Sequence, residues 1–160
     1  MSNVKIQKGI TVVEVLIGAS IFLVVLLGLS TALSLILKAS LANTSKIQAT
    51  FLEEEGLEAI RLLRDGGWTA NIQTLSTNTD YYLTFNGTSY TATTTSSVIN
   101  SIFYRKFRIS NVYRNGSQDI AGSGTLDPKT KLFTVTVSWK DHNATSTESI
   151  QTYLTNIFSN

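Results

Sequence analysis

The chain has 160 residues with a formal net charge of +2, and charged residues make up only 15% of it. That length suits one domain of ordinary size, and so small a net charge directs no strong field toward nucleic acid or an acidic substrate. The absence of cysteine excludes a disulfide framework, a thiolate metal site and a cysteine nucleophile. With one histidine and one proline, metal-dependent or histidine-dependent catalysis has little to build on, so the composition points away from an enzyme.

Residues 15–37 form an uncharged run of 23 residues, preceded by a short polar leader that carries Lys5 and Lys8. As an α-helix the run is about 34 Å long, which is enough to cross a hydrocarbon core of about 30 Å. A cleaved secretory signal, a plain membrane anchor and a more specialised segment compete to explain this layout. The run exceeds the roughly 7–15 apolar residues of an ordinary secretory signal, and a plain anchor leaves Glu14 unexplained.

Glu14 stands at the start of this run and is the only charged residue between Lys8 and Lys38. Ionisable side chains at membrane depth are costly and usually mark function. The alternative is that Glu14 lies in the headgroup zone, where water reaches the carboxylate at little cost. Glu14 taken alone leaves both interpretations open.

The segment KGITVVE (residues 8–14), followed by the long apolar run, resembles the class III signal of type IV prepilins and pseudopilins. The resemblance implies that a prepilin peptidase cuts between Gly9 and Ile10, and that Ile10 becomes the N-methylated first residue of the mature chain. It also implies that Glu14 is needed for subunit assembly. Ile10 stands where phenylalanine is usual, and the mid-span proline of many major pilins is missing, which favours a minor pilin or a pseudopilin over a major subunit.

The helix is expected to continue past Leu37, because residues 38–64 contain no proline and a single glycine, Gly56. The sequence Asp65-Gly66-Gly67 is a stop signal, so one helix is predicted from about Thr11 to Arg64. Six apolar residues of its second half are predicted to pack on a sheet, namely Leu41, Ile47, Phe51, Leu57, Ile60 and Leu63.

Charged residues on the same half of the helix are predicted to face solvent. Glu53, Glu54 and Glu55 resemble an acidic patch but are interpreted as the solvated helix face. Glu58 and Arg61 stand three residues apart, a spacing that supports a helix modestly through an ion pair.

After Trp68 the chain becomes rich in serine and threonine, and apolar residues alternate with a period near two. Residues 81–95 are predicted to form a hairpin on a two-residue Asn86-Gly87 turn. Strands are predicted over 103–112, over 133–139 and over about 145–157, the second being the clearest. Residues 118–131 are rich in glycine and contain Pro128, so a loop is predicted there.

These elements predict an α+β fold, in which a long N-terminal helix, transmembrane in its first half, packs on a C-terminal antiparallel β-sheet of about four or five strands. Such a fold agrees with the resemblance to pilins. The expected organisation is a leader peptide over residues 1–9, a transmembrane and assembly helix over residues 10–37 and a pilin-like globular head over residues 38–160. Within the head, residues 38–64 continue the helix and residues 65–160 form the β-rich part.

Residues able to do chemistry are few in the head. His142 lies in a predicted turn beside Asp141, where an exposed histidine is favoured over a ligand or a base. One region combines aromatic and basic side chains, as single-stranded DNA sites do, but a solvated strand face is the favoured interpretation. Its residues are Tyr104, Lys106, Arg108 and Arg114. No catalytic constellation, metal site or cofactor is predicted.

The sequence therefore predicts a structural subunit of a type IV pilus-like filament, with a minor pilin as the first choice. The resemblance implies as partners the prepilin peptidase, other pilin subunits, the inner-membrane assembly platform and, before assembly, membrane lipid. It implies one membrane crossing with the leader in the cytoplasm and the head outside it, followed by export into an extracellular filament. The alternatives are a pseudopilin of a type II secretion or DNA-uptake machine and, from another class, a membrane-anchored surface domain that binds a ligand or DNA.

Overall fold

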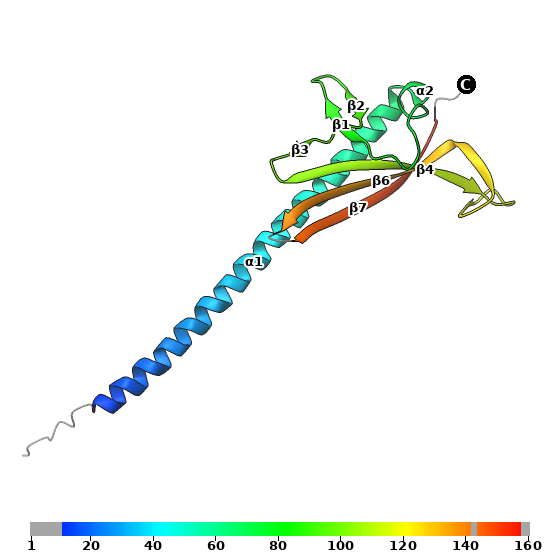
Figure 1. The fold of residues 1–160 in the computed structure, drawn as a ribbon. Coiled ribbons are helices and arrows are strands. Elements are labelled where there is room, and N and C mark those ends of the chain that lie inside the picture. The colour runs from blue at the N-terminus through cyan, green and yellow to red at the C-terminus, as the bar shows by residue number, and fades with distance from the viewer. Residues whose placement is uncertain (1–10, 142–143, 158–160) are drawn as a thin grey trace, which may run out of the picture. The chain divides into compact units, whose positions relative to one another are not determined.

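The fold is α+β, as predicted (Figure 1). It is taken from a computed structural model, which describes residues 11–141 and 144–157. These residues form a long helix α1 (Val12–Asp65), a single-turn helix α2 (Trp68–Asn71) and seven strands. The strands are β1 (Tyr82–Phe85), β2 (Tyr90–Thr93), β3 (Val98–Ile99), β4 (Phe103–Arg114), β5 (Ile120–Ala121), β6 (Thr125–Asp141) and β7 (Ala144–Thr155). The chain divides into two compact units between Asn43 and Thr44, and each unit is described by itself.

Both ends of α1 are set by local backbone chemistry. Thr11 lies just before the helix, and its hydroxyl oxygen accepts a hydrogen bond from the Glu14 N–H at 3.4 Å, as an N-cap side chain does. At the other end the Gly66 N–H donates to the Leu62 carbonyl at 2.9 Å, and Gly67 has a φ of 136°, which only glycine adopts readily. The predicted helix is thus confirmed to within one residue at each end.

The main sheet has five antiparallel strands, in the order β3-β4-β6-β7 with β5 paired to β4. Strands β4 and β6 pair from Phe103↔Trp139 onward, and β6 and β7 pair from Asp141↔Ala144 onward. The three strands predicted in this region are therefore confirmed as consecutive antiparallel neighbours, with β7 at one edge of the sheet.

The predicted hairpin forms, but it differs from the prediction in two respects. Strands β1 and β2 make a two-stranded sheet of their own, and Tyr81, the residue before β1, forms an isolated bridge with Phe107 of the main sheet. The turn has four residues instead of two, because Phe85 pairs with Tyr90. The Asn86 side-chain oxygen accepts hydrogen bonds from the N–H groups of the two residues before Tyr90, at 3.0 and 2.8 Å, and so stabilises the longer turn.

Strand β6 begins earlier than predicted, because the segment 118–131 contains β5 and the start of β6 instead of forming a loop throughout. Proline has no N–H group to donate within a sheet, so it needs an irregular position. The pairing register shifts there: Asn111 pairs with Lys131, whereas Val112 pairs with Asp127. Residues 128–130 therefore have no partner on β4, and Pro128 is accommodated inside a long strand.

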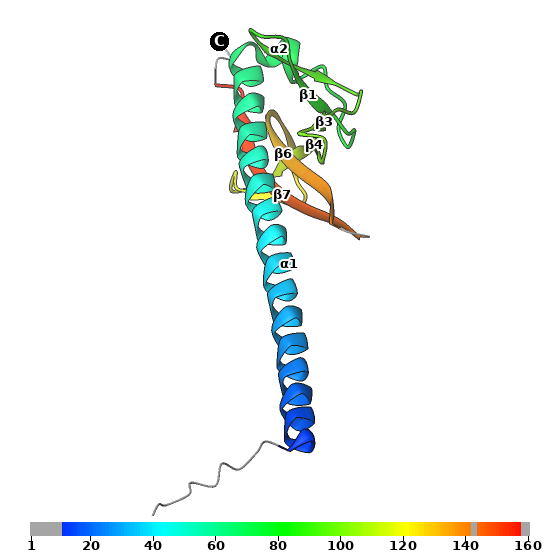
Figure 2. The same cartoon turned by 90° about the vertical axis from the view of Figure 1, so that its left-hand side faces the viewer.

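One face of the main sheet packs against residues 44–65 of α1 (Figure 1 and Figure 2). Along β6, Phe133, Val135 and Val137 are fully buried, whereas Thr134 and Thr136 between them are partly exposed. This alternation confirms the strand that the sequence marks most clearly. The helix contributes Ala49, Glu53, Gly56, Leu57, Ala59, Ile60 and Leu63 to the buried layer.

Half of the predicted apolar stripe of α1 is wrong. Leu57, Ile60 and Leu63 are buried, but Leu41, Ile47 and Phe51 are exposed. Small residues take their place, because they let the sheet come close to the helix. A Cβ atom added at Gly56 would lie 2.9 Å from the Val135 Cγ1 atom, which is closer than real carbon atoms pack.

The buried apolar side chains form two separate clusters. The larger cluster contains thirteen buried residues, drawn from the last turns of α1, from α2, from β1 and the residue before it, and from the centre of the main sheet. The smaller cluster contains four buried residues, Ala49, Phe103, Val137 and Trp139. Charged residues, Arg105 on β4 and Glu148 on β7, flank Val137 of the smaller cluster.

Candidate functional site

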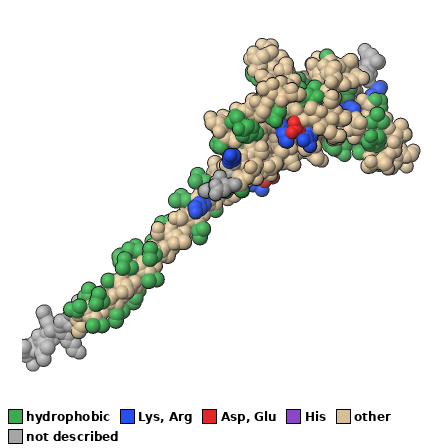
Figure 3. All heavy atoms as spheres, in the orientation of Figure 1, with side chains coloured by type: hydrophobic (Ala, Val, Ile, Leu, Met, Phe, Trp, Pro, Cys, Tyr) green, Lys and Arg blue, Asp and Glu red, His purple; other side chains and the backbone are tan. Residues whose placement is uncertain are grey.

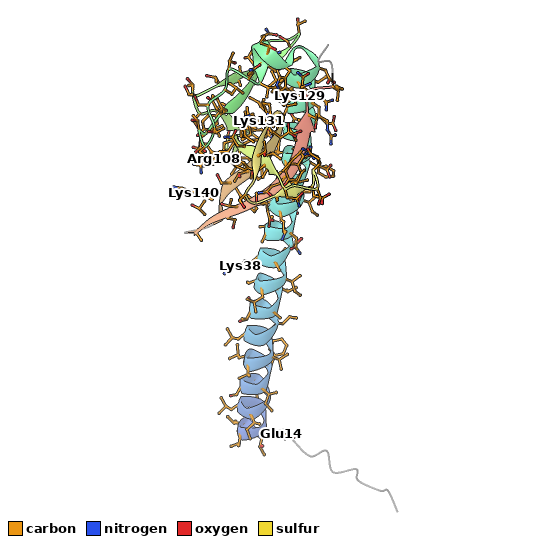
Figure 4. The ribbon with its side chains drawn as sticks, turned by 90° about the vertical axis from the view of Figure 1, so that its right-hand side faces the viewer. Glu14, Lys38, Arg108, Lys129, Lys131 and Lys140 are labelled. Carbon is orange, nitrogen blue, oxygen red and sulfur yellow. The ribbon has the colours of Figure 1, made fainter. Side chains whose placement is uncertain are left out.

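Of the three residues to which the sequence assigns a role, the structure describes one. Gly9 and Ile10 lie outside the described residues. Glu14 lies in the first turn of α1, as Figure 4 shows. The geometry of the candidate site is therefore the geometry of Glu14 and of the helix that follows it.

The part of α1 that lies in the first compact unit, residues 12–43, exposes apolar side chains on all sides. Its large apolar residues from Val12 to Leu37 are between 43% and 76% exposed, and Figure 3 shows hydrophobic side chains along this part of the helix. Helix α1 is the one helix of the described residues that is long and apolar enough to cross a membrane. An isolated helix of this kind is stable in lipid, not in water, so the chain fits a single-pass membrane protein.

Three hydroxyl groups within this apolar segment are satisfied by the helix itself. The hydroxyls of Ser20, Thr31 and Ser34 each donate to the carbonyl four residues earlier, at 2.7, 2.9 and 2.9 Å. Because the bilayer core offers no water, polar groups there must find partners inside the protein. These three residues therefore add little to the free energy of placing the helix in lipid.

Two glycines, Gly18 and Gly28, interrupt the segment, although no contact within the described part of the chain requires a glycine at either position. A Cβ atom added at Gly18 or at Gly28 would meet nothing within 4 Å. Each glycine lowers the stability of a helix by about 1 kcal/mol relative to alanine. In membrane helices, small residues of this kind commonly mark places where another helix approaches closely.

Glu14 is the exception to this apolar surface. Its N–H is bonded to the Thr11 hydroxyl, and the spacing Thr11-x-x-Glu14 is that of a capping box, in which an acidic residue favours the helix start. Among residues 11–141 and 144–157, no side chain forms an ion pair with its carboxylate. The next charged residue along α1 is Lys38, about 36 Å further along the helix.

Two cations of the basic region predicted on β4 share one carboxylate. The Lys106 Nζ atom lies 2.8 Å from one oxygen of Asp80, and the Arg108 Nε donates to the other. The hydrogen bonds from Arg108 and then Lys106 hold the pKa of Asp80 below its usual range. Asp80 thus offsets one of the two positive charges of Lys106 and Arg108.

Arg114, the fourth residue of that predicted region, does not share a face with the other three. The alternation of buried residues along β4 slips by one after Ile109, so that Val112 is buried instead of Asn111. The Arg114 Nε donates to Asp127 at 2.7 Å, and its Nη1 donates to the Gln118 carbonyl at 2.7 Å. The hydrogen bond from Arg114 to Asp127 lowers the pKa of Asp127. It also links the end of β4 to the irregular start of β6.

A metal ion or a small ligand would need a cluster of ligating side chains or a hollow in the head. In the described part of the chain, no three histidine, aspartate or glutamate side chains are placed to share a metal ion. A hollow of about 460 Å³ lies between the end of α1 and the β1–β2 hairpin, lined by Leu62, Phe85 and Tyr90 among others, with no carboxylate, histidine or lysine. His142 lies outside the described residues.

Glu53 is also placed differently from its prediction. It was predicted to face solvent, but it is only 5% exposed, and its Oε1 atom has no hydrogen-bond donor among the described residues. Burial, together with the nearby charge of Glu148, raises the pKa of Glu53 from 4.5 to about 7. Its spacing from Ala49, Gly56 and Ile60 follows one helix face, and this spacing is the sequence signal that could have identified Glu53 as buried.

Comparison of the chain with protein-family models, with curated proteins and with solved structures finds no match.

Proposed function

We propose that this protein is a structural subunit of a type IV pilus-like filament, with a minor pilin as the first choice. The observation that carries the proposal is the exposed apolar helix with one carboxylate in its first turn, attached to an α+β head. In this role the helix is held in the membrane until assembly, and it then packs among the helices of other copies. The head faces away from the cytoplasm, and no residue acts catalytically.

The proposed role of Glu14 follows from the charge that it carries. A helix that leaves lipid for a core of other apolar helices keeps its carboxylate away from water, which costs about 2.5–3.5 kcal/mol at membrane depth. A cationic N-terminal amine at Ile10, on the same or a neighbouring subunit, offsets this cost by pairing with Glu14. Because a displaced helix would leave two buried charges unpaired, the pair also fixes the axial register between subunits.

Gly18 and Gly28 support the same proposal. Nothing in the described part of the chain fills the space beside them, so their cost in helix stability is explained by contacts with a second helix. A pseudopilin of a secretion or DNA-uptake machine uses the same physics and remains the alternative. A plain membrane anchor for a ligand-binding domain requires neither the glycines nor Glu14.

The test compares two replacements of Glu14, because the residue has a local role as well as the proposed one. Glu14→Leu removes both the charge and the capping-box carboxylate, whereas Glu14→Gln removes the charge and keeps a side chain that caps equally well. Ser20→Leu, a change within the same apolar segment, is the matched control. Each variant is expressed in cells that assemble filaments, and the subunit is measured in membranes and in sheared filaments.

We expect all three variants to insert and to be cut after Gly9, giving a methylated Ile10 terminus by intact-mass analysis. Both Glu14 variants should be depleted from filaments at least tenfold, whereas Ser20→Leu should enter them. Normal incorporation of Glu14→Gln would show that the carboxylate only caps the helix. Retention of Met1 in cells that process prepilins would refute the proposed maturation.

A further inference from the structure

Two charged residues flank the smaller cluster where it borders the larger one. Across the helix-facing side of the main sheet, Arg105 on β4 pairs with Val137 on β6, which in turn pairs with Glu148 on β7. The rows on either side of this row are apolar on β4 and β6. Glu53 of α1 lies between Ala49, which belongs to the smaller cluster, and Leu57, which belongs to the larger cluster.

The cation of this row, Arg105, already has bonding partners other than Glu53. The guanidinium of Arg105 donates to the Leu52 carbonyl at 3.0 Å and lies 3.1 Å from a carboxylate oxygen of Glu55. The Tyr90 hydroxyl also donates to Glu55, at 3.3 Å. Arg105 is therefore directed to the flank of the helix and forms no ion pair with Glu53.

The remaining charges around Glu53 do not compensate it either. Lys46, one turn before Ala49, lies 3.0 Å from a carboxylate oxygen of Glu148 and is largely exposed. Strand β6 presents no titratable side chain to this part of the helix, only apolar ones. Glu148 itself carries a negative charge. A carboxylate at Glu53 thus meets apolar side chains and a like charge, and both favour its protonated form.

The two clusters differ in the number of buried side chains that stabilise them. Four buried residues form the smaller cluster and thirteen form the larger. A buried charge at the boundary weakens both, but the part with fewer buried contacts opens at the lower free energy. Because burial and Glu148 raise the pKa of Glu53 to about 7, its charge changes near neutral pH.

We propose that Glu53 is a proton-operated latch on the smaller cluster: with the carboxyl protonated, the turn of α1 around Ala49 stays packed on Phe103 and Trp139, and loss of the proton releases that turn while the larger cluster stays packed. The bond that breaks on release of the proton is the carboxyl O–H, and the proton passes to solvent. The proposal stands independently of the filament role.

The two tryptophans of the chain make the latch measurable, because Trp139 belongs to the smaller cluster and Trp68 to the larger. The full chain is purified in detergent micelles. Trp68→Phe leaves Trp139 as the only tryptophan, and Trp139→Phe leaves Trp68. His142 is the only histidine and ordinarily titrates near pH 6.5, so His142→Gln is added to every variant to remove that contribution.

Trp139 emission should move to longer wavelength as the pH rises from 5 to 9, with a midpoint near 7, whereas Trp68 emission should stay constant. Glu53→Gln should abolish the transition. Glu148→Gln should move the midpoint to lower pH, because it removes the repelling charge. Glu54→Gln, a change at the exposed neighbour, should leave the midpoint unchanged.

Three results would overturn the proposal. They are a constant Trp139 signal in the chain with Glu53, a transition that survives Glu53→Gln, and a Trp68 signal that follows Trp139, which would indicate unfolding of the whole head. If a tryptophan variant fails to fold, hydrogen exchange of the chain with both tryptophans tests the same proposal. Amides of residues 46–53 should lose protection above pH 7 to a greater degree than amides of residues 57–63, and equal loss would refute the latch.

Discussion

Replacing Val135 by aspartate tests whether the sheet face assigned to the core is the one that packs on α1. Val135 has no exposed surface, and on its flanks lie Phe107 of β4 and Ile150 of β7. Its Cγ1 atom lies against the helix at Gly56. An aspartate there meets apolar side chains, and the buried cation nearby, Arg105, is already bonded to Leu52 and Glu55.

The size of the effect follows from two contributions. To be buried without charge at pH 7, an aspartate with an ordinary pKa near 3.9 must take up a proton, which costs about 4 kcal/mol. Losing the buried valine side chain removes about 1.5–2 kcal/mol of apolar burial. The sum of about 6 kcal/mol is comparable to the 5–15 kcal/mol that stabilises a typical domain, so Val135→Asp should leave the head largely unfolded at pH 7.

Thr136→Asp is the matched control, because Thr136 is on the opposite face and pairs with Lys106. It should change the free energy of unfolding by less than about 1 kcal/mol. Fluorescence of Trp68 and Trp139, both 6% exposed and both in the head, measures unfolding in detergent. Val135→Asp should regain native fluorescence partly at pH 4, where the carboxyl is protonated without cost. Equal stability of the two variants at pH 7 would mean that the helix does not cover this face.

Three further predictions concern single residues of the head. The raised pKa of Glu53 means that the folded state keeps a proton that the unfolded chain loses. The free energy of unfolding should therefore fall by about 3 kcal/mol as pH rises from about 4.5 to 7. Denaturant titrations should find no such fall in Glu53→Gln. The carboxylate of Asp80 has a lowered pKa, so Asp80→Asn should lose less than about 1 kcal/mol of stability at pH 7 and a smaller amount at pH 2, as thermal unfolding would show. An equal loss at both pH values would exclude the ion pairs with Lys106 and Arg108 as its cause. Gly56→Leu should push the sheet from the helix and lower the free energy of unfolding by about 1–3 kcal/mol. A neutral effect in the same assay would show that Val135 and Arg105 can move aside.

The helix and the main strands could be predicted because their signals are local. An uncharged run followed by good helix formers and two glycines defines α1, and strict alternation around Val135 defines β6. The turn at Asn86 was predicted too short, because Asn-Gly suits a two-residue turn while the pairing of Phe85 with Tyr90 decides the actual length. Local sequence holds no information on that pairing.

The errors on α1 have a different origin. Phe51 and Glu53 were assigned by their hydrophobicity, which is the usual guide to burial. The sheet instead selects small side chains that allow close approach, so that Gly56 marks the centre of the contact and a glutamate is buried two residues after an exposed phenylalanine. For the candidate site, the pattern around Glu14 could be read from the sequence, whereas the absence of a partner for it among the described residues required the structure.

The order of elements along the chain also determines the order in which the head can fold. Strands β4, β6 and β7 are hairpin neighbours, so the sheet closes through contacts that are short in sequence. The contacts between helix and sheet are distant, with 53 residues separating Leu52 from Arg105. During synthesis the buried face of α1 emerges about 90 residues before Leu154 completes the sheet, a delay of about 5–20 s at ordinary rates of translation. For that interval Leu57, Ile60 and Leu63 have no sheet to cover them, and we expect this face to need a chaperone or the membrane surface until β7 is made.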